Sequence, residues 1–324
     1  MYTVNDTPMH SEISQTLWWT FGIIVFATLV IDLFVLGRNP TMTFKKALFW
    51  VCIWITLGLG FNGYVFAKLG SAKGLEFFSG YLVELALSVD NLFVFILIFK
   101  FFQVPAAYHH RVIFWGVLGA MLMRALFVYL GSVLIAQFAW VVVIFGLFLV
   151  FTGFKSLFDD GGDAIDLAKN PAIKTLKRIL PMTPDYRGQA FFSKEGGRWL
   201  ATPLLLVVIV VEISDVIFAI DSVPAVFGIT QDPFIVYASN IFAILGLRSL
   251  YFVLAGAMVS LPYLKQGVAL ILIFVGAKMV IEHFLHVPIG VSLSVILSIL
   301  ATSAVASIAQ NKRERQDAMA KLES

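Results

Sequence analysis

The chain has 324 residues, of which 60% are hydrophobic and only 13% are charged, and its mean hydropathy is +0.91. Soluble domains carry about 25% charged residues, so this composition excludes a soluble protein and indicates an integral membrane protein. The net charge of +3 is small and the basic residues fall between apolar runs, so nucleic acid is not an expected partner. The single cysteine, Cys52, excludes an intrachain disulfide.

Apolar runs of about 20 residues recur along the chain and predict an all-α, polytopic membrane protein. We expect nine transmembrane helices, at 17–36, 47–68, 77–99, 111–131, 133–155, 200–221, 234–256, 264–284 and 288–309. Glycine and proline mark the joints between them, for example at Gly70 and Gly74. The whole chain, 1–324, is expected to form one transmembrane domain, with a cytoplasmic loop at 156–199 and a cytoplasmic tail at 310–324.

Basic residues predict the orientation, because cytoplasmic loops carry an excess of Lys and Arg. One set of alternate loops holds nearly all of them: Arg38, Lys45, Lys46, Lys100, Arg111, a cluster from Lys169 to Arg198, Lys265, Lys312, Arg313, Arg315 and Lys321. The opposite set holds only Lys68 and Lys73. We therefore expect the N-terminus outside and the C-terminus in the cytoplasm.

The loop at 156–199 is the one extended polar region of the sequence. It begins with four aspartates, Asp159, Asp160, Asp163 and Asp166, and then turns basic. Its segment 164–179 has the pattern of a short amphipathic helix on the inner membrane face. Metal sensing by the aspartates is an alternative, but their spacing does not match an EF-hand, and a solvated linker is the favoured interpretation.

Three features recur in the same order in helices 3–5 and in helices 6–8. They are an acid pair with five residues between its members (Glu84 and Asp90; Asp215 and Asp221), an arginine (Arg124; Arg248) and a Gly-x-Lys motif (ending at Lys155; Lys278). A unit of three helices enters the membrane from the opposite side in its second copy, and such inverted 3+3 repeats are a recurring plan of secondary transporters. We expect helices 3 and 6 to face each other and to bring both acid pairs together.

A carboxylate inside hydrocarbon is costly unless it is paired, hydrated or bound to a cation, so these acids predict a buried cation site. The candidate ligands are Glu84, Asp90, Asn91, Glu212, Asp215 and Asp221, with Ser88, Ser222 and Asn240 as further oxygen donors. An all-oxygen set favours Mg²⁺, Ca²⁺ or Mn²⁺, and the residues alone do not separate these three. Asp90 and Asp221 lie about 120° from the line of the other acids on a straight helix, so we expect unwinding there, aided by Pro224.

Charge pairing is the alternative interpretation of the acids. Arg124 and Arg248 also lie at depth, and they could neutralise two carboxylates in a purely structural network. We favour arginines that pair with some of the acids when the site is empty, or that fix its geometry.

Several other charged residues have simpler explanations. Asp32 is expected to pair with Arg38 or to lie at the membrane interface, and Lys155 and Lys278 to extend toward it from near helix ends. The cluster of Glu282, His283 and His286 is interpreted as interfacial.

Three long segments carry a resemblance to a known family. They are Glu84-Leu-Ala-Leu-Ser-Val-Asp90-Asn91-Leu-Phe-Val-Phe, Glu212-Ile-Ser-Asp215-Val-Ile-Phe-Ala-Ile-Asp221-Ser222-Val-Pro-Ala-Val-Phe and Ser239-Asn240-Ile-Phe-Ala-Ile-Leu-Gly-Leu-Arg248. They closely resemble the TerC family, and the length, the span count and the Ile31-Asp32-Leu33 segment resemble its Alx-type bacterial members. The resemblance implies a protein of the bacterial inner membrane that exports manganese from the cytoplasm, with Mn²⁺ as transported substrate and no permanent cofactor. It also implies links to alkaline pH, to tellurium resistance and to the supply of metal to extracytoplasmic enzymes.

The expected function is therefore a secondary transporter, and not an enzyme, that exports Mn²⁺ in exchange for protons on the same carboxylates. Its expected partners are Mn²⁺ and the lipid bilayer, with extracytoplasmic metalloenzymes or secretion machinery as further candidates. The main alternative is a membrane scaffold or tellurite-linked stress-resistance protein whose acids form structural ion pairs. A channel is a further alternative. An intramembrane enzyme is disfavoured, because the sequence lacks a His-Glu-x-x-His motif and a serine–base arrangement.

Overall fold

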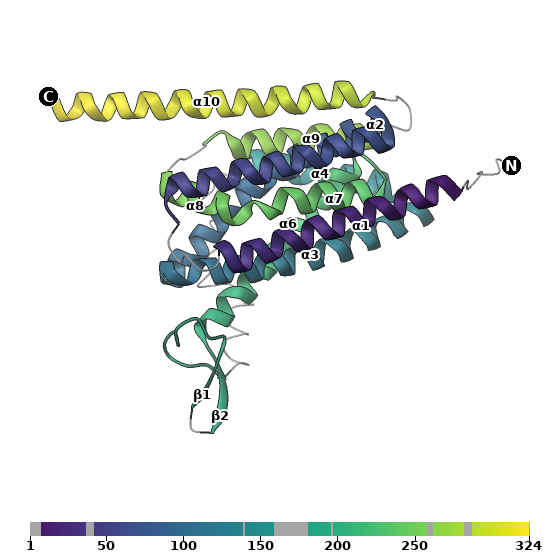
Figure 1. Cartoon of the computed structure of the whole chain (residues 1–324). Coiled ribbons are helices and arrows are strands. Elements are labelled where there is room, and N and C mark those ends of the chain that lie inside the picture. Colours follow the sequence, from purple (N-terminus) through teal and green to yellow (C-terminus); the bar gives the residue numbers. More distant parts are fainter. Residues whose placement is uncertain are drawn as a thin grey trace.

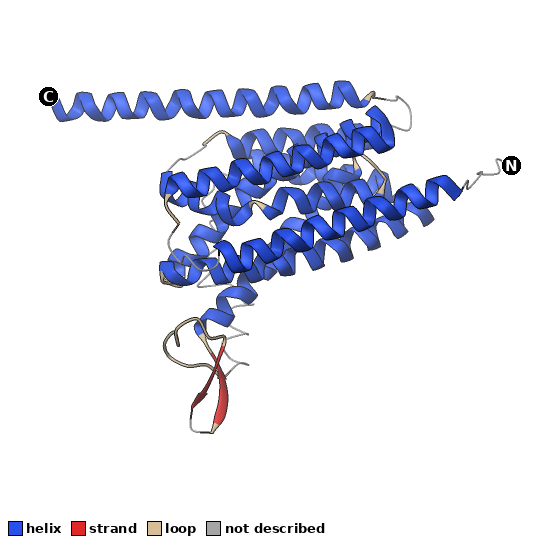
Figure 2. Cartoon of the chain, viewed as in Figure 1, coloured by secondary structure: helices blue, strands red, loops and turns tan. Residues whose placement is uncertain are grey.

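The computed structural model describes residues 8–36, 42–138, 140–158, 181–195, 197–257, 262–281 and 287–323. This part of the chain is almost entirely helical, as Figure 2 shows. Eight of its helices are long and apolar enough to cross a membrane: Gln15–Phe34, Phe44–Phe101, Ala106–Gln137, Trp140–Phe158, Pro203–Phe227, Pro233–Ala255, Leu264–Ile281 and Ile289–Glu314. The prediction of a polytopic, all-helical membrane protein is therefore confirmed.

The elements follow one another along the chain as labelled in Figure 1. They are α1 (Pro8–Ile31), the π-helix η1 (Asp32–Leu36), α2 (Phe44–Phe101), α3 (Ala106–Gln137), α4 (Trp140–Phe158), β1 (Phe192–Glu195), β2 (Arg198–Ala201), α6 (Pro203–Phe227), α7 (Pro233–Leu245), α8 (Leu247–Ala257), α9 (Leu264–Ile281) and α10 (Ile289–Glu323).

Helix α2 combines the second and third helices expected from the sequence. Its 58 residues would measure about 87 Å if straight, far more than the roughly 30 Å of a bilayer core. Gly70 interrupts it with a φ of 87° and a ψ of 175°, a conformation that glycine adopts because it has no Cβ. The joint expected at Gly70 is thus a real break in the helix, whereas Gly74 lies inside the helical stretch that follows.

One joint differs from the expectation. The span predicted as one helix at 234–256 is divided at Gly246, where α7 ends and α8 begins. The segment predicted as a cytoplasmic tail, 310–324, is helical to Glu323 as the end of α10, and its cytoplasmic position stays a prediction.

The polar loop ends in a small antiparallel hairpin that was not predicted. In it Phe192 pairs with Ala201 and Glu195 with Arg198. The Tyr186 hydroxyl donates a hydrogen bond of 2.8 Å to the carbonyl of Phe102 and so holds this segment at the end of α2. The amphipathic helix predicted at 164–179 and the four aspartates lie outside the described residues.

The helices pack in three main pairs: α4 with α9, α2 with α7, and α3 with α6. Glycines allow the first pair to approach closely. A Cβ on Gly146 would lie 2.7 Å from the carbonyl oxygen of Gly276, and a Cβ on Gly276 would lie 2.5 Å from that of Gly146. The two backbones are therefore in direct contact.

Helices α1 and α10 are among the most exposed helices of the bundle. In Figure 1, α10 runs along the edge of the bundle beside α9 and α2, while α1 packs mainly through α7. The start of α1 and the end of α10 lie at opposite ends of the bundle (Figure 1). The expectation that the first and last helices are peripheral agrees with this packing. The first half of α2 is less peripheral, because the Trp54 indole donates to the Ser249 hydroxyl of α8 at 3.3 Å.

Candidate functional site

Four helices meet around one buried ion pair. The Arg124 guanidinium of α3 pairs with the Glu84 carboxylate of α2, and both side chains are fully buried. Arg124 also donates a hydrogen bond of 2.5 Å to the amide oxygen of Asn240 on α7. The Asn240 amide nitrogen donates in turn to the carbonyl of Val236 at 2.8 Å, which fixes which end of the amide faces Arg124. Three candidate residues predicted from the sequence are thus in one network.

Asp215 of α6 is the second acid beside this pair. Its carboxylate is attracted by Arg124 and repelled by Glu84, so one guanidinium faces two carboxyl groups. Ser222, two helical turns after Asp215 on α6, faces the Glu84 carboxylate. Asp215 is 3% exposed, and its Oδ2 makes no hydrogen bond with any residue that the structure describes.

The buried polar residues form matching stripes on α2 and α6. Glu84, Ser88 and Asn91 are at positions i, i+4 and i+7 of α2, and all three are buried. Asp215 and Ser222 are at positions i and i+7 of α6, and both are buried as well. Residues at this spacing share one helix face, so each helix turns a polar stripe toward the protein interior. Within the described part of the chain, the Ser88 hydroxyl is also without a hydrogen-bond partner.

The remaining acids make no contact with Arg124 that the structure describes. Glu212 is half-buried, with its carboxylate lying against Gly119 of α3 and close enough to Asp215 to repel it. Asp221 is half-buried and interacts electrostatically with Lys155 at the end of α4. Asp90 belongs to α2, but its side chain lies outside what the structure describes. Among the described side chains, no three from His, Cys, Asp and Glu are grouped closely enough to hold a metal ion.

The unwinding expected near Asp90 and Asp221 is not seen. Helix α6 continues through Pro224 to Phe227, and α2 is helical from its break at Gly70 to Phe101. Pro224 has no N–H and so removes the hydrogen bond to the carbonyl of Ile220, but α6 stays helical for three more residues beyond it. The interruption in this region falls instead at Gly246, between Asn240 and Arg248.

Arg248 does not join the acids of the site. It forms an ion pair of 3.1 Å with Asp32 at the end of α1 and donates to the Asp32 carbonyl at 2.9 Å. The sequence suggested Arg38 as the partner of Asp32, but Arg38 lies outside the described residues. Lys278 also differs from the expectation, because it is only 8% exposed and donates to the carbonyl of Gly228 at 3.3 Å. It therefore points into the protein rather than toward the membrane surface.

A second polar group, which the sequence did not reveal, lies where α2 resumes after Gly70. We call it the Lys73 cluster, and it consists of Lys73, Glu76, Thr230 and Asp232. Lys73 pairs with Glu76 at 2.8 Å and with Asp232 at 3.5 Å, and the Thr230 hydroxyl donates to Glu76 at 2.5 Å. Asp232 also caps α7 by accepting hydrogen bonds from its first backbone amides. These residues line a cavity of about 640 Å³ that extends to Lys278. They link the start of the second half of α2 to the α6–α7 connection.

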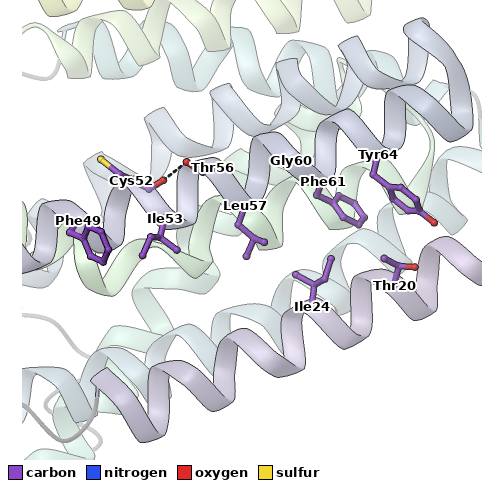
Figure 3. A pocket seen from close by; sticks show the side chains of 10 residues that line it. All are labelled: Thr20, Ile24, Phe49, Cys52, Ile53, Thr56, Leu57, Gly60, Phe61 and Tyr64. Carbon is purple, nitrogen blue, oxygen red and sulfur yellow. Dashed lines mark hydrogen bonds between the residues drawn. The ribbon is translucent and has the colours of Figure 1, made fainter.

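A further cavity, of about 570 Å³, is apolar and lies between α1 and the first half of α2 (Figure 3). It is lined by Ile24, Leu57, Phe61 and other residues of these two helices. Its polar groups are largely satisfied locally, as when the Thr56 hydroxyl donates to the carbonyl of Cys52 at 2.7 Å. None of the candidate acids lines this groove.

The buried acids, the arginines and the asparagine lie in the region that matches a known family model, described as "Integral membrane protein TerC family", over residues 69–316. The chain belongs to the TerC family. Relatives are similar over almost their whole length. A Myxococcus xanthus protein named "Uncharacterized membrane protein STKORF319" is 46% identical over 300 residues, which cover 92% of this chain and 94% of that one.

Several of these relatives share one name. The Escherichia coli (strain K12) protein named "Putative membrane-bound redox modulator Alx" is 44% identical over 318 residues, covering 94% of this chain and 98% of that protein. The Photorhabdus laumondii protein of the same name is 43% identical over 314 residues, covering 94% of this chain and 98% of that protein. The Alx-type resemblance is thereby confirmed. No solved structure matches the chain.

Proposed function

We propose that this TerC family protein is a secondary transporter that exports a divalent cation, Mn²⁺, from the cytoplasm through the site between α2, α3, α6 and α7. The observation that carries the proposal is the excess of buried acid around a single arginine. If Glu84 and Asp215 are both ionised, Arg124 neutralises only one of them, and a net negative charge remains inside the membrane. Such a charge is costly unless a cation compensates it, so the site favours a positively charged cargo.

The oxygen donors beside the ion pair support a hard cation. Asp215 and Ser88 each present a buried oxygen without a hydrogen-bond partner in the described part of the chain. Buried polar atoms are nearly always satisfied in proteins, so these oxygens are available to a ligand or to water. Carboxylate, hydroxyl and amide oxygens suit Mn²⁺, Mg²⁺ or Ca²⁺, and the choice of Mn²⁺ among them follows the family resemblance.

We propose that the two halves form an inverted repeat, and two pairs of matching contacts support this. The motif match aligns Gly153 with Gly276, and therefore Gly146 with Ala269, which lie seven residues earlier. A two-fold exchange of the halves turns the close approach of Gly153 to the Ala269 carbonyl into that of Gly276 to the Gly146 carbonyl, and both contacts are present. The pairings of α2 with α7 and of α3 with α6 exchange in the same way. We therefore propose nine crossings, with the break at Gly70 separating two of them.

The proposed coupling uses protons. Export against an inside-negative potential costs about 2.3 kcal/mol per charge per 100 mV, so it requires a driving ion. Metal binding displaces protons from carboxyl groups, and a counter-flow of protons through Glu84 and Asp215 would supply the drive. A rate of Mn²⁺ transport that ignores the pH gradient across the membrane would contradict this part of the proposal.

The experiment that tests the function is uptake of ⁵⁴Mn²⁺ into inside-out membrane vesicles. We expect saturable uptake by the wild type and a loss of at least about tenfold for Asp215→Asn and for the pair Asp90→Asn, Asp221→Asn. Glu195→Gln is the matched control, because it neutralises an acid of the β1–β2 hairpin outside the bundle. Equal flux in all four proteins would reject the site.

The buried pair of Glu84 and Arg124 also favours one second candidate, the membrane scaffold. In that case the acids serve to hold α2, α3 and α6 together. The scaffold predicts that Asp215→Asn lowers the unfolding temperature, whereas the transporter predicts a folded protein without flux. Thermal unfolding of the same purified variants separates the two functions.

A further inference from the structure

We propose that this protein holds a phosphoryl anion, the headgroup of an anionic phospholipid, in a basic pocket at the end of the bundle opposite the Lys73 cluster. The pocket has a volume of about 450 Å³ and lies where η1, the start of α3 and the start of α8 meet. It is separate from the acids around Arg124. The pocket is lined by the basic residues Arg248, Arg111 and His110 and by the apolar residues Leu33, Phe114 and Trp115.

The floor of the pocket is an incompletely satisfied arginine. Arg248 is 2% exposed. Its Nη1 makes both the hydrogen bond to the Asp32 carbonyl and the ion pair with the Asp32 carboxylate. Its Nε and Nη2 make no hydrogen bond with any residue in the described ranges. A guanidinium presents five donors in a planar fork, and that of Arg248, which lines the pocket, keeps two nitrogens without a partner among the described residues.

A second arginine lies in the same wall. Arg111 packs over the ring of Phe191 at 4.7 Å, which holds its guanidinium in place, and its buried Nε also has no hydrogen-bond partner among the described residues. His110 lies near enough to both arginines to be repelled by them when it is protonated. Asp32 balances one of the two arginines, so among the described residues the pocket keeps one positive charge without an acidic partner. Planar, forked donors with a net positive charge match phosphate oxygens.

The rest of the pocket suits a lipid. Leu33, Phe114 and Trp115 line it, and Leu33 and Trp115 are 47% and 43% exposed, so the apolar wall continues onto the lipid-facing surface. Tryptophan is enriched at the headgroup level of membranes. Basic pockets between transmembrane helices, close to the headgroup region, bind anionic lipid headgroups. A phospholipid can place its phosphate on the two arginines and an acyl chain along the apolar wall, which a soluble phosphate cannot do.

The test uses the full chain in phosphatidylcholine nanodiscs containing a small fraction of phosphatidylglycerol, with native mass spectrometry to count the lipids retained. We expect the wild type to retain phosphatidylglycerol, and Arg111→Gln to weaken this retention by about tenfold or more. Lys100→Gln is the matched control, since it removes an exposed positive charge at the end of α2 outside the pocket. If Arg111→Gln does not fold, Arg111→Lys replaces it, with a several-fold loss expected because the fork is lost.

A second arm identifies the source of the phosphoryl group. Thermal unfolding in pure phosphatidylcholine is measured with and without inorganic phosphate. Stabilisation by phosphate that depends on Arg111, without retention of phosphatidylglycerol, would keep the anion site but assign it a soluble ligand. No binding of either probe, or an equal loss in Arg111→Gln and Lys100→Gln, would overturn the proposal.

Discussion

Arg124 is the residue on which the centre of the molecule depends. It is fully buried, and it joins Glu84 of α2 to Asn240 of α7 while also facing Asp215. Removing one partner of a buried ion pair is more damaging than removing both, because the remaining charge is left without compensation. The same residue therefore links the packing of three helices to the charge of the candidate site.

We expect Arg124→Gln to destabilise the protein by about 3–5 kcal/mol, and the double variant Arg124→Gln, Glu84→Gln to recover much of that loss. The measurement is unfolding of purified protein in detergent, followed by circular dichroism. Arg187→Gln is the control, because Arg187 forms an exposed ion pair with Glu195 that is worth about 0–1 kcal/mol. A double variant less stable than Arg124→Gln alone would contradict the assignment of Glu84 as its partner.

The sequence could predict which residues are chemically important, but not how they pair. Acids such as Glu84 and Asp215 stand out because they interrupt apolar runs. The pairing of Arg124 with Asn240, and of Arg248 with Asp32, joins residues more than 100 positions apart. No local pattern encodes such contacts, since they depend on how the helices are placed side by side.

At the scale of elements, α4 and α9 approach so closely at glycines that backbone atoms of the two helices are in contact. Gly146 and Gly276 place carbonyl oxygens where a side chain would otherwise be. Small residues let transmembrane backbones approach closely, and packing and weak polar contacts then hold the helices together. The seam tolerates little added volume, because the atoms that a new Cβ would meet belong to backbone.

Gly276→Ala is expected to destabilise the protein by about 1–3 kcal/mol, because its Cβ would lie 2.5 Å from the Gly146 carbonyl oxygen and the helices must move apart. Thermal unfolding in detergent is the measurement. Gly60→Ala of α2 is the control, since its added Cβ would meet nothing within 4 Å. Similar melting temperatures for the two variants would show that the seam is looser than described.

The elements also show where sequence patterns are reliable. Apolar runs and glycine located most of the helices, including the break at Gly70. Pro224 was misleading, because it falls in the last turn of α6, where the helix ends in any case. Gly246 was overlooked, because a single glycine within an apolar run does not reveal whether the helix continues through it.

At the scale of the whole molecule, the start of α1 and the end of α10 lie at opposite ends of the bundle. The proposed nine crossings, an odd number, agree with this arrangement. The distribution of Lys and Arg predicts the direction, with the β1–β2 hairpin in the cytoplasm and the Lys73 cluster outside.

Cysteine labelling can test this orientation, because the chain has one natural cysteine. In a Cys52→Ser background, Gln231→Cys is expected to react with a membrane-impermeant maleimide in intact cells, and Lys194→Cys only after the cells are opened. Both positions are exposed, so access across the membrane is the difference being measured. Labelling of both positions in intact cells would contradict the proposed crossings, and the reversed pattern would invert the orientation.

The direct contact of backbones between α4 and α9 limits how the molecule can move. A seam built from side chains can slide as rotamers change, but carbonyl groups lying against glycines have no such freedom. Any large rearrangement that opens the bundle at alternate ends would then have to keep the α4–α9 contact intact. Helices α2, α3, α6 and α7 would rotate about that contact as an axis. The Gly146–Gly276 contact would therefore change least between the two conformations.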